Sequence, residues 1–145
     1  MNYSVEEFDS AKTKVMNYIM YKKRTEYEVK NKFSKILEEN LLNDIIEYVK
    51  EAGYLGDANY IERAVAEFKN LNNLSRKEVK YKLYSKGISN DLIEDYFSEN
   101  SEELYEYELR SATNIFNKKI NTMEKEDILN YLRKKGYKQE IICKL

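Results

Sequence analysis

Lysine and tyrosine side chains alternate along the stretch SRKEVKYKLYSKG, residues 75–87, in a pattern that could bind a nucleic acid. At about 100° per residue, Val79 and Leu83 fall on one side of a helix and are expected to face the core. The opposite side carries two lysines and two tyrosines: Lys77, Lys80, Tyr81 and Tyr84. Lysine ammonium groups neutralise phosphates, and tyrosine rings can stack on unpaired bases. The alternative is that the tyrosines pack between structural units while the lysines stay solvated.

Two further stretches resemble this one: TEYEVKNKFSK at residues 25–35 and EKEDILNYLRKKG at residues 124–136. Their outward sides carry polar, basic and aromatic residues: Tyr27, Lys30, Asn31, Asn130 and Arg133, with Lys134 beside them. The sequence therefore indicates a set of candidate contacts for a partner or a nucleic acid: Lys22, Lys23, Arg24, Lys30, Lys77, Lys80, Tyr81, Lys82, Tyr84, Arg133, Lys134 and Lys135.

The formal net charge of −1 conceals strong segregation of charge along the chain. Residues 11–35 hold eight basic residues against two acidic ones, residues 69–86 hold six against one, and residues 117–138 hold seven against three. Residues 91–108 hold eight acidic residues and no basic one. A net charge near zero therefore does not exclude local surfaces that bind anions. The alternative for each run is a solvated helix face.

The acidic run contains Glu99, Glu103 and Glu106, which could share a helical face and hold a divalent ion. No motif with the spacing of a metal site accompanies them, so we predict a solvated acidic face and no metal site. A protein partner with a basic surface is a better use for such a face.

The residue types of the chain give little support for a catalytic function. The chain has no histidine, which removes the commonest general base and metal ligand. Cys143 lies in the final apolar segment EIICKL and is expected to fill the core rather than act as a nucleophile. The two glycines of GYLG lack the spacing of a phosphate-binding loop. We therefore predict a protein that is not an enzyme and needs no cofactor.

The cysteine content and the hydropathy bear on the compartment. A single cysteine excludes an internal disulfide and fits a reducing cytosol. The sequence shows no signal peptide and no apolar run of membrane-spanning length, and Met1 is expected to be the genuine start. We therefore expect a cytoplasmic monomer with no membrane contact.

The elements that position these residues are predicted to be helices throughout. Proline is absent and glycine occurs four times, so the usual punctuation of strands and turns is missing. Periodicity and capping residues predict helices at these ranges: 5–23, 26–36, 42–52, 58–71, 76–86, 90–98, 102–120, 124–135 and 138–145.

The ends of the predicted helices carry capping chemistry. Three hydroxyl and carboxylate pairs have the spacing of a capping box: Ser4/Glu7, Thr25/Glu28 and Ser75/Glu78. Single N-caps are expected at three further positions: Asp57, Ser89 and Ser101. Three glycines follow predicted helices, where a left-handed residue suits the C-terminal cap: Gly53, Gly87 and Gly136.

The helices fall into three copies of one unit. Pairs of apolar residues four positions apart recur with offsets of 50 and then 49 residues: Val29 and Phe33, Val79 and Leu83, and Ile128 and Leu132. A three-helix unit of this size buries little surface alone, so neighbouring units must share a core. We therefore predict an all-α fold, an elongated array of three tandem three-helix repeats. It forms one domain over residues 1–145, with repeats at approximately 5–54, 55–99 and 100–145.

Three stretches also carry a resemblance to a known family. They are EAGYLGDANYIERAV at residues 51–65, SRKEVKYKLYSKGIS at residues 75–89 and ILNYLRKKGYKQEII at residues 128–142. In order and spacing they are similar to three segments of the RecX family, the bacterial regulatory proteins of the RecA recombinase. Those segments read "GYLDD…FA", "I…EL…KGI" and "L…L.RRGF…VI". The resemblance extends from about Ala11 to Leu145.

This resemblance implies three tandem three-helix repeats that bind along the groove of the RecA–single-stranded DNA filament. It also implies inhibition of ATP hydrolysis and strand exchange by RecA, without catalytic residues of the chain's own. One departure is the stretch FKNLNNLS at residues 68–75, where the family often has a basic loop with Gly-Pro. This difference argues against a strong direct DNA contact from that loop.

Two other classes of function stay open. One is a helical-repeat scaffold for protein–protein contact without nucleic acid. The other is a small helix-turn-helix DNA-binding protein, which is disfavoured because its reading helix should be the most basic and the three candidate helices are similar.

Overall fold

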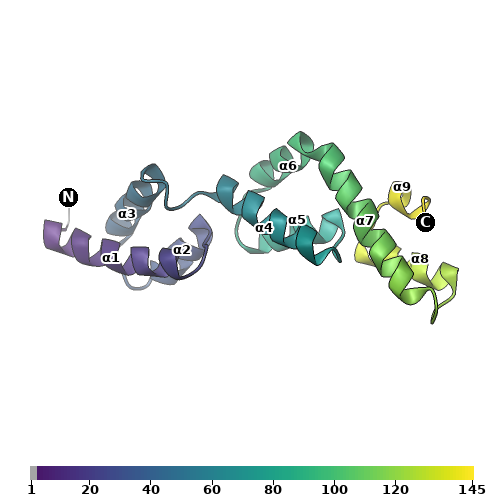
Figure 1. Ribbon diagram of the computed structural model, residues 1–145. Coiled ribbons are helices and arrows are strands. Elements are labelled where there is room, and N and C mark those ends of the chain that lie inside the picture. The colour runs from purple at the N-terminus through teal and green to yellow at the C-terminus, as the bar shows by residue number, and fades with distance from the viewer. Residues whose placement is uncertain (1–2) are drawn as a thin grey trace. The chain divides into compact units, whose positions relative to one another are not determined.

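The computed structural model describes residues 3–145, and within this range every regular element is a helix (Figure 1). The helices of these residues are α1 (Val5–Tyr21), α2 (Glu26–Phe33), α3 (Glu39–Glu51), α4 (Asp57–Leu71), α5 (Arg76–Ser85), α6 (Asn90–Glu99), α7 (Ser101–Lys119), α8 (Lys125–Lys135) and α9 (Gln139–Ile142). The first helix of each successive set of three is the longest, with 17, 15 and 19 residues. The structure thus confirms the predicted all-α fold of repeated units, each with one long and two shorter helices.

Several helix ends differ from the prediction. α1 ends at Tyr21 and α2 at Phe33, two and three residues earlier than expected. α3 begins at Glu39, earlier than expected, because the Glu38 carboxylate accepts hydrogen bonds of 3.2 Å from the amides of two first-turn residues. α9 covers only Gln139–Ile142, where a longer helix had been predicted. Glu38 thus fills the role that Ser, Thr, Asp or Asn usually has at an N-cap, so no ordinary signal in the sequence marks this helix start.

All three predicted capping boxes are present. In each box the hydroxyl accepts a 3.1 Å hydrogen bond from the amide three residues later: Ser4 from Glu7, Thr25 from Glu28, and Ser75 from Glu78. In each box the carboxylate in turn accepts a bond from the amide of the cap residue. Ser89 caps α6 as predicted, by accepting a 3.4 Å bond from the Leu92 amide. The three boxes fix where α1, α2 and α5 begin.

Two predicted N-caps are wrong. Asp57 is the first residue of α4, and its carboxylate accepts a 3.0 Å bond from the amide of Glu26 on α2 instead of capping its own helix. Ser101 is the first residue of α7, and the preceding Asn100 is the N-cap without a side-chain capping bond. Only Asn100 separates α6 from α7, and its side-chain amide donates to the Tyr96 carbonyl at the end of α6.

The described chain forms two compact units. Unit 1 comprises the chain up to Tyr60 together with Lys86–Ile88, and unit 2 comprises Ile61–Ser85 and Ser89–Leu145. In unit 1, α1 packs against α2 and α3 (Figure 1). The buried core of this unit consists of Ala11, Val15, Ile19, Val29, Phe33, Leu41, Leu42, Ile45, Ile46, Val49 and Leu55. The four-residue spacing on α1 places one stripe of that helix in this core.

In unit 2, α7 packs against α6, α8 and α9 (Figure 1), and α5 packs against α6. The apolar core around the last three helices consists of Ala112, Ile115, Ile128, Leu129, Leu132, Tyr137, Ile141 and Ile142. Val79 and Leu83 of α5 are buried, as their spacing predicted. The assignment of residues 1–145 to a single domain stays a prediction. No helix within residues 3–145 is both long and apolar enough to span a membrane.

Candidate partner-binding surface

The outward side of α5 is basic and aromatic. Tyr81 and Tyr84 are 71% and 60% exposed, and Lys77 and Lys82 are exposed beside them. Within unit 2, these tyrosines therefore do not pack between helices as the alternative supposed. Neither lysine has an ion-pair partner among residues 3–145. An exposed tyrosine beside an unpaired lysine can offer both a stacking surface and a positive charge to a partner.

Lys80 lies on the same helix but is engaged within the fold. Its ammonium group is 3.0 Å from the carboxylate of Glu94 on α6 and 4.9 Å from the centre of the Phe97 ring. An exposed pair of this kind contributes little to stability, because water screens both charges. The pair nevertheless lowers the free positive charge on this part of α5.

A cavity of about 460 Å³ lies beside the first turns of α5, wholly within unit 2. Its lining combines four basic residues, one carboxylate, two hydroxyls, two apolar side chains and a glycine: Arg76, Lys77, Lys80, Lys138, Glu94, Ser98, Ser101, Phe97, Leu104 and Gly136. Lys138 was not among the residues indicated by the sequence. It precedes α9 as its N-cap residue, and its place near α5 follows from the packing of that segment.

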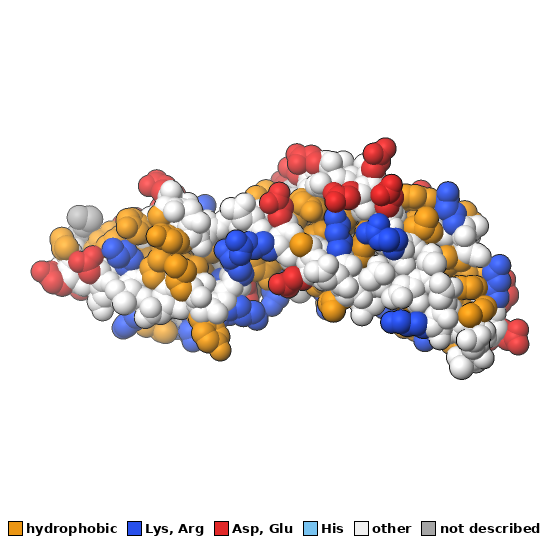
Figure 2. Space-filling view, viewed as in Figure 1, with side chains coloured by type: hydrophobic (Ala, Val, Ile, Leu, Met, Phe, Trp, Pro, Cys, Tyr) orange, Lys and Arg blue, Asp and Glu red, His pale blue; other side chains and the backbone are white. Residues whose placement is uncertain are grey.

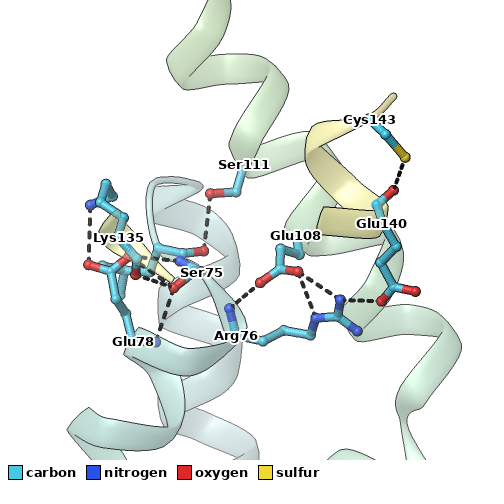
Figure 3. A network of polar contacts seen from close by, with 9 residues as sticks. Ser75, Arg76, Glu78, Glu108, Ser111, Lys135, Glu140 and Cys143 are labelled. Carbon is cyan, nitrogen blue, oxygen red and sulfur yellow. Dashed lines mark hydrogen bonds and ion pairs between the residues drawn. The ribbon is translucent and has the colours of Figure 1, made fainter. Parts of the chain in front are cut away.

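Arg76 lines this cavity and joins α5 to α7 and α9 (Figure 3). Its backbone amide donates to Glu108 Oε1 at 2.7 Å, and its guanidinium donates to Glu108 Oε2 at 2.7 and 2.9 Å. Nη2 also donates to Glu140 at 2.9 Å. Glu108 is fully buried, so these bonds replace the water that a carboxylate requires. Burial disfavours the charged guanidinium, but the bonds to Glu108 and Glu140 outweigh it and raise the pKa of Arg76.

The N-cap of α5 is tied to the end of α8 (Figure 3). The Ser75 hydroxyl donates to the carbonyl of Lys135 at 3.0 Å, and the Lys135 ammonium lies 3.2 Å from Glu78. The Lys135 ammonium also lies 5.9 Å from the centre of the Tyr131 ring. Lys135 is therefore held inside the fold, although its charge had made it a candidate partner contact.

A buried polar cluster holds the loop before α5 against α7. The Ser111 hydroxyl donates to the carbonyl of Leu74 at 3.1 Å, so the neighbouring Tyr137 hydroxyl donates to Ser111. The Tyr107 hydroxyl accepts from the Leu74 amide at 3.3 Å. Burial raises the pKa of Tyr137 and that of Tyr107, because the phenolate would lose its hydration. The loop that the sequence flagged as a departure from the family is thus fixed by tertiary bonds.

Unit 1 contains the same kind of junction, in which the N-cap hydroxyl of one helix bonds to the backbone at or just after the end of a later helix. The Thr25 hydroxyl donates to the carbonyl of Lys86 at 2.6 Å, and the Lys86 ammonium lies 3.8 Å from Glu28. Tyr27 is 53% exposed and packs over Gly87, where an added Cβ would lie 2.2 Å from the Tyr27 Cβ. Gly87 has a φ of 84°, a conformation that glycine adopts without strain.

The other residues indicated by the sequence are divided between free and engaged. Lys22, Lys23 and Lys134 are exposed without an ion-pair partner among the residues that the structure describes. Arg24 stacks over the Tyr18 ring at 3.9 Å, and Lys30 is paired with Glu26 at 3.2 Å. Arg133 donates to its helix neighbour Asn130 at 2.7 Å and to Gln139 at 3.4 Å. The candidates of α5 belong to unit 2, whereas those near residues 22–30 belong to unit 1.

Seven of the eight carboxylates in the acidic run are exposed on α6 and the beginning of α7, and the eighth, Glu108, is buried. Figure 2 shows acidic side chains gathered over these helices, with basic side chains directly beneath them. Glu103 is exposed and lies 3.0 Å from Lys69. Within residues 3–145, no group of three or more acidic or cysteine side chains lies close enough to hold a metal ion.

The prediction for Cys143 is wrong, because this residue is exposed. The short α9 buries Ile141 and Ile142 and ends at once, so Cys143 falls at the C-cap on the outer side. Its thiol donates to the carbonyl of Glu140 at 3.4 Å (Figure 3). The apolar residues of this segment do not reveal that the helix ends at Ile142, one residue before Cys143.

Comparisons with known proteins agree with the arrangement of the helices. No family model matches the chain. The regulatory protein RecX of Finegoldia magna is 32% identical over 149 residues, covering 95% of this chain and 71% of that protein. The regulatory protein RecX of Clostridioides difficile is 27% identical over 144 residues, covering 94% of this chain and 66% of that protein. The chain therefore spans about two thirds of the length of these curated relatives.

Solved structures show the same fold. The crystal structure of RecX from Lactobacillus salivarius has a TM-score of 0.80 at 24% identity, over 97% of this chain and 95% of that chain. A second crystal structure, of regulatory protein RecX, has a TM-score of 0.74 at 21% identity, over 92% of this chain and 70% of that chain. With the sequence identity to the Finegoldia magna protein, these likenesses establish that the chain belongs to the RecX family of regulatory proteins.

Proposed function

We propose that this chain binds RecA–single-stranded DNA filaments in the cytoplasm and inhibits the ATPase and strand-exchange activities of RecA, without being an enzyme itself. Membership of the RecX family supports this proposal at the level of the partner. The two curated RecX relatives are longer than this chain, so the proposal concerns the activity of these helices alone.

The observation that carries the proposal is the outward side of α5. Lys77 and Lys82 are exposed and unpaired within residues 3–145, and two exposed tyrosines lie on the same helix. Unpaired ammonium groups gain the most from a phosphate, because they have no internal carboxylate to give up. A filament presents phosphates at regular intervals, so several weak contacts of this kind add together.

The acidic face of α6 and α7 supports a contact with protein as well as with DNA. Its carboxylates repel phosphates, and they would instead meet basic side chains of RecA. Acidic and basic surfaces lie next to each other on the face in Figure 2. This arrangement suits a partner that is itself made of protein and nucleic acid.

The test is the DNA-dependent ATPase of RecA, taken from the organism that encodes this chain, with purified chain titrated in. We expect the rate of ATP hydrolysis to fall at substoichiometric or near-equal amounts of the chain. Inhibition should weaken as salt rises, because phosphate contacts displace counterions. An unchanged ATPase rate across low and moderate salt, with folded protein, would refute the proposal.

A charge-reversal variant locates the surface. Reversing Lys77, Lys80 and Lys82 together to Glu should weaken inhibition and leave the helical circular dichroism spectrum intact. Lys144→Glu is the matched control, since Lys144 is exposed near the end of the chain in the same unit. Equal inhibition by the triple variant and by the unaltered chain would remove α5 from the binding surface.

One observation favours a second candidate, a scaffold for protein–protein contact without nucleic acid. Much of the basic charge indicated by the sequence already has a partner within the chain: Arg24 with Tyr18, Lys30 with Glu26, Lys80 with Glu94, and Lys135 with Glu78. A scaffold would bind RecA equally well without DNA, and this binding would resist salt. Affinity for free RecA compared with the assembled filament, measured at two salt concentrations, separates the two candidates.

A further inference from the structure

The two junctions of the fold carry different residues against their glycine. In unit 1, the Tyr27 side chain packs over Gly87. Fifty residues later, the corresponding position holds Lys77, which packs beside Gly136 in unit 2. An added Cβ at Gly136 would lie 3.0 Å from Lys77 Cδ, so the lysine stem lies against the glycine in the same way as the tyrosine. The second junction therefore keeps the glycine and replaces an aromatic ring with a flexible cation.

This exchange contributes to the cavity beside α5. Lys77 and Gly136 both line it, together with Lys80 and Lys138. Lys77 and Lys138 have no ion-pair partner among residues 3–145, while Lys80 shares the one lining carboxylate, Glu94. The hydroxyls of two serines, Ser98 and Ser101, also line the cavity. Cations from separate segments of the chain thus converge on a hollow that contains more positive than negative charge.

We propose that this cavity binds a phosphate group. A carboxylate is best recognised by an arginine fork, but the guanidinium of Arg76 is already bound to Glu108 and Glu140. The free cations are lysines, which bind phosphate as point charges. The two hydroxyl donors in the lining suit the several oxygens of the same group. The phosphate can come from a single nucleic-acid strand or from a free nucleotide or inorganic phosphate.

This site shares Lys77 and Lys80 with the outward side of α5 but does not include Tyr81 or Tyr84. If the phosphate comes from a nucleic-acid strand, the inference deepens the proposed function by naming one contact of the filament's DNA. If the phosphate is free, the site is a separate ligand site. In either case the binding can be measured on the chain alone, without RecA.

The experiment titrates the folded chain with inorganic phosphate and, separately, with a short oligo-dT strand, and follows backbone amide resonances by NMR. We expect phosphate to shift the Gly136 and Ser101 amides saturably. We expect Lys77→Tyr, which restores the residue of the first junction, to abolish those shifts. Lys118→Gln, an exposed lysine of the same unit outside the cavity, is the matched control and should leave them unchanged.

The two sources of phosphate give different results. If the strand supplies it, oligo-dT competes with phosphate, and Lys77→Tyr lowers the salt slope of oligonucleotide binding by about one. If the strand leaves the Gly136 amide unshifted while phosphate shifts it, the ligand is a free phosphate. Lys138→Gln serves as a second variant if Lys77→Tyr does not fold. The proposal is overturned if phosphate causes no saturable shift, or if the cavity variants and the Lys118 variant behave alike.

The outcome is independent of the ATPase test. A cavity that binds phosphate in a chain that does not slow RecA would leave this inference standing and refute the proposed function. A chain that slows RecA but shows no phosphate shift would support the proposed function and overturn this inference.

Discussion

The Ser75 hydroxyl donates a 3.0 Å hydrogen bond to the carbonyl oxygen of Lys135, sixty residues away. The same hydroxyl accepts from the Glu78 amide, so one side chain both begins α5 and ties it to the end of α8. Thr25 does the same for α2 with the carbonyl of Lys86 in unit 1. At the corresponding N-cap of α8 the residue is Glu124, which has no side-chain capping bond. A hydroxyl N-cap is thus found at Thr25 and Ser75, the two positions where a later segment of the chain bonds to it.

Replacing Ser75 with Ala should therefore cost more than the loss of an ordinary cap. The variant loses the capping bond and the bond to Lys135, and we expect a decrease of about 2 kcal/mol in the free energy of unfolding. Ser4→Ala is the control, because Ser4 forms a capping box without such a distant bond, and it should cost about 1 kcal/mol. Urea denaturation of both variants measures the difference. Equal costs would mean that the bond to Lys135 contributes nothing.

Removing Arg76 should destabilise unit 2 strongly. Arg76→Ala leaves the fully buried Glu108 without its guanidinium partner, which should cost about 3–5 kcal/mol. Lys80→Ala removes an exposed ion pair with Glu94 and should cost less than about 1 kcal/mol. Denaturant midpoints of the two variants test this contrast. A small effect of Arg76→Ala would show that Glu108 finds water or another donor when the arginine is absent.

Substitution of three glycines by alanine should distinguish the cost of backbone strain from the cost of steric overlap. Gly56→Ala should change stability little, since the nearest atom to an added Cβ is 3.8 Å away. Gly53→Ala meets no atom within 4 Å but forces alanine to a φ of 83°, a strain of about 1–2 kcal/mol.

Gly87→Ala adds to a similar strain an overlap with Tyr27, so it should be the most destabilising of the three. Thermal unfolding of the three variants, with circular dichroism as the probe, gives their order. A Gly87 variant no worse than the Gly53 variant would mean that Tyr27 moves away at little cost.

Asp57 should make stability depend on pH. Burial raises the pKa of this carboxyl, and the hydrogen bond from the Glu26 amide offsets it only in part. The folded state therefore favours the protonated carboxyl. The stabilisation that this protonated form gives the fold is lost as pH rises through the raised pKa. Asp57→Asn keeps an acceptor for the Glu26 amide without the charge, so it should be more stable than the unaltered chain at pH 7.

The gain from Asp57→Asn should vanish as the pH falls below about 4, where Asp57 is protonated in both folded and unfolded chains. Asp57→Ala is the control, because it removes the charge and also leaves the Glu26 amide without an acceptor. Unfolding free energies measured from pH 3 to pH 7 test the prediction. If the gain in stability from Asp57→Asn persists at pH 3, it comes from packing and not from the loss of the charge.

Much of the fold was determined by the sequence itself. Capping boxes such as Ser75/Glu78 act over three residues, so the chain needs no tertiary context to begin α2 or α5 there. The four-residue spacing of Val79 and Leu83 gave the buried side of α5, and its recurrence 50 and 49 residues away gave the repeats. These features are local, and local chemistry can be read from neighbouring residues.

The state of each charged residue was decided only by tertiary structure. Lys77 and Lys80 lie three residues apart on one helix, yet Lys77 is free within residues 3–145 and Lys80 meets Glu94. Glu108 is one of eight acidic residues in its run, and only its place on α7 opposite Arg76 makes it buried and bonded. The convergence of Lys138 on α5 likewise depends on the packing of the segment before α9. Partners tens of residues apart meet through packing, because helix periodicity says which side a residue faces and not which side chain lies opposite.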